Sequence, residues 1–150
     1  MADFKLTYAT MFNPPEELHA GFDKAVEKLK KNMGQEYTML IDGKEVKADE
    51  KFDDHSPVNT DWVLAKMQKG NSKHAQDALT AARKAFPMWS RTPWQKRVEL
   101  LRKAASLIEE RIFDLGAAMA LEVGKNRMES LGDVQETADL IYYSCYQMEK

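Results

Sequence analysis

Two carboxylates three residues apart are the side chains whose types and spacing best suit chemistry in this sequence. Asp133 and Glu136 lie in a stretch whose apolar residues recur at helical spacing, and positions i and i+3 share a helix face. A carboxylate on such a face can position a substrate or influence a nearby proton transfer. Because charged residues are mostly exposed, the spacing alone favours a solvated acidic face.

The other reactive side chains form no recognisable catalytic or metal-binding pattern. Cys145 is the single cysteine, lies on the apolar side of the same helical stretch and has no basic neighbour in sequence, so we expect a buried structural thiol. His19, His55 and His74 lie in separate segments without metal-ligand spacing, and we expect surface residues. No glycine-rich phosphate loop is present. We therefore assign no catalytic, cofactor-binding or metal-binding residue.

Composition indicates a globular chain and excludes several partner classes. The 150 residues are 43% hydrophobic and 31% charged, as in one ordinary domain. A net charge of −2 gives no basic surface for nucleic acid or a membrane, and no apolar run reaches bilayer length. One cysteine excludes an internal disulfide, and the first residues lack a signal-peptide pattern. We expect a cytoplasmic protein.

The chain is expected to begin with an extended arm and a helix. Residues up to Phe12 have no periodicity. Asn13 precedes two prolines and two acids, a typical helix start, so we expect its side chain to cap the helix. An apolar stripe follows, and Gly34 is a natural terminator.

A hairpin and a loop are predicted next. Asp42-Gly43 lies between two β-prone runs, which predicts a type I′ turn within residues 37–46. Residues 47–61 are polar and are interpreted as loop. Residues 62–67 are compatible with one short strand.

Helices are predicted for the rest of the chain. Asn71 or Ser72 should cap the first of them, whose narrow, alanine-rich face permits close packing and which should end or kink around Phe86 because Pro87 follows. Thr92 opens an apparent capping box with proline at the first helical position.

The helix after that box should be followed by another over 113–123, which Gly124 interrupts. The last helix should run from about Arg127 to Lys150, without a stop signal, which favours a chain that continues further. We expect the sheet that would cover these helices to lie in further sequence. The apolar side of the last helix contains Leu131, Val134, Ala138, Ile141 and Cys145.

Read in order, four segments resemble the N-terminal region of aldehyde dehydrogenases. The helical arm and residues 34–46 resemble the branch that oxidises L-glutamate γ-semialdehyde, the 1-pyrroline-5-carboxylate dehydrogenases. The chain departs from the family at Ser56-Pro57, where Asn-Pro is common. The segments are IDGKEV (41–46), SPVNTDWVLAKM (56–67), ALTAARKAFPMWSRTPWQKRVELLRKAASLIEER (78–111) and LEVGKNRMESLGDVQETADLIYY (121–143).

The resemblance implies a parent α/β protein with a Rossmann-type cofactor domain, of which this segment is mainly α-helical with one N-terminal β-hairpin. The division it implies is an arm and helix over 1–36, a hairpin and loop over 37–70, and a helical, incomplete part of the cofactor-binding domain over 71–150. It also implies that Glu136 faces the aldehyde-entry pocket and that Asp133 is a structural partner of a basic residue.

The implied function is that of an NAD(P)-dependent aldehyde dehydrogenase in proline catabolism. The family's catalytic cysteine, general base and nucleotide-binding turn follow the matched region, so we expect this segment alone to bind no NAD or NADP and to be inactive. Its expected partners are the remainder of the polypeptide, further copies in a homo-oligomer and a small aldehyde. Another aldehyde dehydrogenase branch or a stand-alone helical protein-interaction module are the alternatives.

Overall fold

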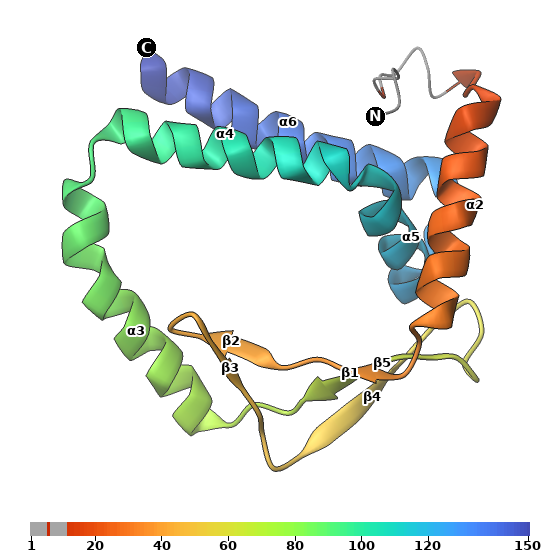
Figure 1. Ribbon diagram of the computed structural model, residues 1–150, viewed down its shortest axis with the longest axis horizontal. Coiled ribbons are helices and arrows are strands. Elements are labelled where there is room, and N and C mark those ends of the chain that lie inside the picture. The colour runs from red at the N-terminus through yellow and green to blue at the C-terminus, as the bar shows by residue number, and fades with distance from the viewer. Residues whose placement is uncertain (1–5, 7–11) are drawn as a thin grey trace.

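The computed structural model describes Leu6 and residues 12–150 (Figure 1). Most of the predicted N-terminal arm therefore lies outside the described residues. The described part is mainly helical with short strands, as expected. None of its helices combines the length and apolar character needed to span a bilayer. Its elements are α2 (Glu16–Lys31), β1 (Gln35–Glu36), β2 (Met39–Ile41), β3 (Lys44–Val46), β4 (Lys51–His55), β5 (Val63–Gln68), α3 (Ser72–Arg91), α4 (Trp94–Glu110), α5 (Ile112–Val123) and α6 (Arg127–Glu149).

The first described helix is not capped by the predicted residue. The N-cap position of α2 is Pro15, in an extended conformation and without a side-chain cap. The prediction of Asn13 as the cap is wrong, because two prolines separate it from the first helical residue and its side chain lies too far upstream to meet the free N–H groups. Gly34 does take a positive φ of 75° just after the helix.

The hairpin prediction is confirmed. Strands β2 and β3 pair antiparallel, and both turn residues have positive φ, 52° at Asp42 and 71° at Gly43. This is the type I′ geometry for which an Asp-Gly pair is suited.

The prediction that residues 47–61 form only loop is wrong. Strand β4 lies within them and pairs antiparallel with β5, and β1 adds to the other edge of β5 in parallel. Nearly all of β4 is exposed and polar, so the strand lacks the hydrophobic alternation by which half-buried strands are recognised. The strand predicted at 62–67 is confirmed as β5, which buries Leu64 and Ala65.

Two helix-boundary predictions are corrected at the junction of α3 and α4. Helix α3 has the expected cap at Asn71 but continues through Pro87 to Arg91. A proline removes one backbone hydrogen bond of a helix, and because this helix is exposed, water can bind the carbonyl oxygen that is left without a partner. Thr92 opens no capping box. Its hydroxyl donates instead to the Met88 carbonyl at 3.0 Å, because Thr92 itself ends α3 and leaves Pro93 as the N-cap of α4.

Helices α4 and α6 lie side by side and antiparallel, and α5 packs between α6 and α2 (Figure 1). The predicted apolar side of α6 is buried except for the half-buried Ile141. Cys145 is 1% exposed with its Sγ 3.8 Å from the Val98 carbonyl oxygen, so it is a structural thiol as expected. Helix α3 stands apart and buries no residue among those described, so the close packing predicted for its alanine-rich face is not seen there.

Candidate substrate-binding groove

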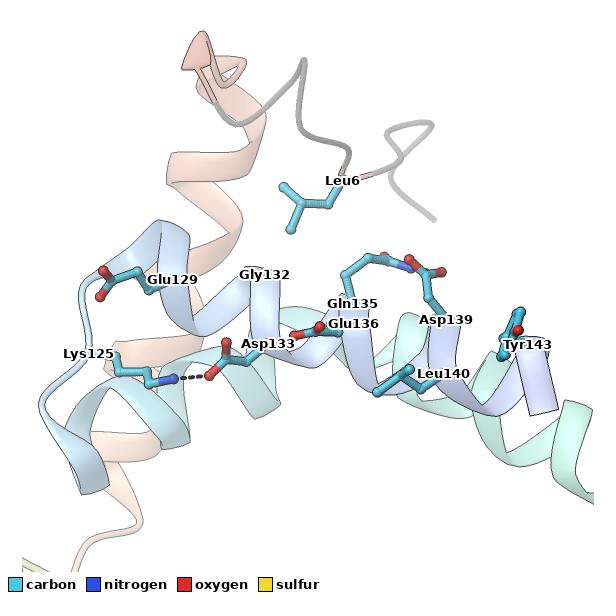
Figure 2. A pocket seen from close by; sticks show the side chains of 10 residues that line it. All are labelled: Leu6, Lys125, Glu129, Gly132, Asp133, Gln135, Glu136, Asp139, Leu140 and Tyr143. Carbon is cyan, nitrogen blue, oxygen red and sulfur yellow. Dashed lines mark hydrogen bonds and ion pairs between the residues drawn. The ribbon is translucent and has the colours of Figure 1, made fainter.

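The turn between α5 and α6 places the first residue of the site. Gly124 ends α5 in the left-handed conformation, with φ 73°. Asn126 caps α6 by accepting a hydrogen bond from the Glu129 backbone N–H at 3.0 Å. Lys125 lies between the helix end at Gly124 and the helix cap at Asn126, and its side chain extends along the start of α6 (Figure 2).

The start of α6 is fastened to α2 through one arginine. Arg127 forms an ion pair with Asp23, donates from Nη1 to His19 Nδ1 at 2.7 Å and lies 4.7 Å from the centre of the Phe22 ring. An arginine can only donate, so His19 Nδ1 is the acceptor of this hydrogen bond. His19 is therefore half-buried between helices rather than a surface residue, whereas His55 is exposed as predicted.

The loop before β5 is fastened to α5 in a similar way. Ser56 is fully buried, donates from Oγ to the Leu121 carbonyl at 2.5 Å and accepts from the Val58 backbone N–H at 3.2 Å. The family that the chain resembles commonly has asparagine at this position. Here the serine donates a hydrogen bond to a carbonyl oxygen in the last turn of α5, which would otherwise lack a helical partner.

One face of α6 forms the floor of an open groove of about 750 Å³, with Leu6 above it (Figure 2). Glu136 lines this groove, and Asp133 lies one turn before it. The carboxylates on this face are spaced by three or four residues and so lie in one row. The lining residues are Leu6, Lys125, Glu129, Gly132, Asp133, Gln135, Glu136, Asp139, Leu140 and Tyr143.

Asp133 and Glu136 have different surroundings. Asp133 forms an ion pair with Lys125, which confirms the expected basic partner. This hydrogen bond raises the pKa of Lys125 above its usual 10.5, and the charges of Asp133, Glu129 and Glu136 add to the effect. The Glu136 side chain is exposed and has no hydrogen-bond or ion-pair partner among the described residues.

A buried polar network under the groove was not predicted. Gln135 is 7% exposed and donates from Nε2 to Glu109 Oε1 and Asp139 Oδ1, each at 3.1 Å. The Tyr142 hydroxyl donates to Glu109 Oε2 at 3.0 Å, and burial together with this carboxylate raises the pKa of Tyr142. The one feature of the sequence that could have indicated this network is a glutamine beside the apolar side of the last helix. Its partner, Glu109, lies 26 residues away in the sequence.

The described residues that line the groove supply carboxylates and one ammonium group rather than a thiol or an imidazole. Its lining contains neither cysteine nor histidine, and Cys145 is not part of it. No cluster of His, Cys, Asp or Glu suited to a metal ion occurs in the part of the chain that the structure describes. An open, acidic groove of this kind suits a ligand that carries a positive charge or hydroxyl groups.

Comparison with known proteins supports the resemblance. The aldehyde dehydrogenase family matches residues 45–150. A 1-pyrroline-5-carboxylate dehydrogenase of Staphylococcus haemolyticus is 34% identical over 85% of this chain and 25% of its own length. A crystal structure of the 1-pyrroline-5-carboxylate dehydrogenase from Thermus with bound NAD has a TM-score of 0.87 and 31% identity, over 97% of this chain and 28% of that protein.

A second solved aldehyde dehydrogenase matches with a lower TM-score and a slightly higher sequence identity. The NAD-dependent aldehyde dehydrogenase of Sinorhizobium meliloti has a TM-score of 0.72 and 33% identity, over 80% of this chain and 24% of that protein. The chain spans about a quarter of the length of the curated relatives it matches. The family match covers well over half of its residues, and the chain therefore belongs to the aldehyde dehydrogenase family.

Proposed function

We propose that this chain forms the N-terminal part of an NAD(P)-dependent aldehyde dehydrogenase that oxidises L-glutamate γ-semialdehyde to L-glutamate in proline catabolism. Two observations support this branch. The 1-pyrroline-5-carboxylate dehydrogenases resemble the chain over α2 and the strands as well as over the later helices, and the Thermus enzyme has the higher TM-score of the two solved structures compared above.

Within this proposal, Glu136 is the substrate-facing residue of the chain. The observation that carries the assignment is the contrast in the groove, where Asp133 is engaged by Lys125 while the Glu136 carboxylate is exposed and unpaired among the described residues. A free carboxylate can accept a hydrogen bond from the ammonium group of an amino-acid aldehyde. It thereby orients the aldehyde for the reacting groups of the complete enzyme.

The groove does not fit a dinucleotide. Four carboxylates line it, and they would repel a pyrophosphate group. Phosphates in proteins are instead cradled by backbone N–H groups at glycine-rich turns or helix N-termini. We propose that NAD or NADP is held by other parts of the complete enzyme.

The remaining parts of the proposal concern assembly and location. We propose a homo-oligomer of the complete enzyme, which exposed apolar side chains such as Leu79, Phe86 and Met88 on α3 support. We propose the cytoplasm, because the single cysteine is a free thiol. We propose the division into 1–36, 37–70 and 71–150, whose second boundary falls between β5 and α3, whereas the first separates β1 from its partner strand β5.

The test is a substrate comparison with the complete dehydrogenase that contains this chain. NADH or NADPH formation is followed with L-glutamate γ-semialdehyde, succinate semialdehyde and betaine aldehyde. We expect the highest kcat/KM with the first. A higher kcat/KM with another aldehyde would assign the chain to a different branch, and no turnover with any aldehyde would favour a helical interaction module, for which the uncovered α3 would be the binding face.

A further inference from the structure

Lys125 has a special place in the groove because it is the one cation among the described residues that line it. The left-handed Gly124 and the Asn126 cap hold its backbone on either side. Four carboxylates from α6 line the same groove, those of Glu129, Asp133, Glu136 and Asp139, and the first three act on Lys125.

The lysine engages one of these carboxylates directly. Its Nζ pairs with Asp133 Oδ2, whereas Glu129 and Glu136 act on it only through their charges. Asp133 and Glu136 are neighbours on the helix face, where two like charges at this spacing destabilise each other. The ion pair with Lys125 offsets this repulsion and directs one carboxylate oxygen of Asp133 toward the lysine (Figure 2).

We propose that Lys125 is a positioning residue for the reaction, which holds Asp133 so that Glu136 is the carboxylate that meets the substrate. The inference rests on the proposed role of Glu136. Lys125 itself does not touch the substrate. Without it, the Asp133 carboxylate is released one turn from Glu136 and competes with it for the cationic group of the aldehyde, which is then held in more than one orientation.

The two carboxylates make the inference testable by charge removal. In the complete dehydrogenase, Lys125→Met should lower kcat with L-glutamate γ-semialdehyde about tenfold, and KM should stay the same or fall, because aldehyde bound in an unreactive orientation still occupies the site. Lys125→Arg keeps the cation and should behave like wild type. The double variant Lys125→Met with Asp133→Asn should recover most of the loss, because the released charge is gone.

A matched control is available on α3. Lys73 and Asp77 form an exposed lysine–aspartate pair at 2.7 Å far from the groove, so Lys73→Met should leave kcat and KM unchanged. This control separates the loss of a surface ion pair as such from the loss of the pair beside Glu136.

The outcomes separate this inference from the proposed function. A Lys125→Met enzyme with wild-type kcat, or a double variant in which Asp133→Asn restores nothing, would overturn the positioning role. In a Glu136→Ala background, Lys125→Met should have no further effect, and a full additional loss would also overturn it while leaving Glu136 in place. Wild-type kinetics for Glu136→Ala alone would overturn the role of Glu136 and this inference with it.

Discussion

Replacement of Glu136 by alanine removes the one carboxylate of the groove that we assign to substrate. The side chain is exposed and has no partner among the described residues. Its removal therefore breaks no hydrogen bond or ion pair within the described part of the fold, and the free energy of unfolding should change by less than about 0.5 kcal/mol. Any larger effect on catalysis then reports on the substrate and not on folding.

The expected size follows from the surroundings of the carboxylate. A hydrogen bond to a charged group contributes about 1.5–3 kcal/mol, and the open groove places Glu136 at or just below the lower limit because water competes for it. About 1.4 kcal/mol corresponds to a tenfold loss of kcat/KM. Asp133→Ala should instead act mainly on stability, and only weakly, because its ion pair with Lys125 is exposed.

Steady-state kinetics with L-glutamate γ-semialdehyde and thermal unfolding of both variants of the complete enzyme test this reasoning. Glu136→Gln should recover part of the activity, since the amide oxygen still accepts a hydrogen bond. A solvated acidic face without function predicts little effect from either alanine. Unchanged kcat/KM for Glu136→Ala, or a loss that simply follows a lowered unfolding temperature, would refute the assignment.

Three further outcomes are expected. Gly116→Ala should destabilise the complete protein by about 1–3 kcal/mol, because the new Cβ would lie 2.7 Å from Leu131 Cδ2; an unchanged unfolding midpoint would contradict this. Lys51 and Gln68 donate hydrogen bonds that hold the pKa of Glu36 below its usual 4.5, so its stabilising contribution is present above pH 4.5 and is lost as the pH falls through the lower folded value. Glu36→Gln should remove this part of the pH dependence in acid unfolding curves. The isolated 150-residue chain should be helical by circular dichroism but loosely packed, should bind no NAD measurably in calorimetry and should oxidise no aldehyde; turnover or a sharp, cooperative melt of a monomer would count against this.

The sequence by itself determined the features that depend on a few adjacent residues. Asp42-Gly43 specifies a type I′ turn, Gly124 a helix end and Asn71 a helix cap, because each acts on backbone atoms within a few positions. The apolar side of α6 was also predictable, because helical periodicity indicates which residues share the buried face, and this does not depend on which element packs against it.

Competition between neighbouring elements was decided only by the fold. Thr92 has the chemistry of a cap, but the end of α3 takes its hydroxyl before α4 begins. Strand β4 is mostly polar and almost wholly exposed, and it becomes a strand only because β5 offers it a ladder of backbone hydrogen bonds. Neither outcome can be predicted from the residues of the local segment alone.

The same distinction applies to the groove. The i, i+3 spacing placed Asp133 and Glu136 on one helix face, and the resemblance singled out the second. Which of the two is engaged depended on the path of the chain through Gly124, which returns Lys125 to Asp133 eight residues away. The Glu109–Gln135 contact joins α4 to α6 across 26 residues. Such long-range pairings follow from the packing of whole helices, and tertiary structure alone supplies them.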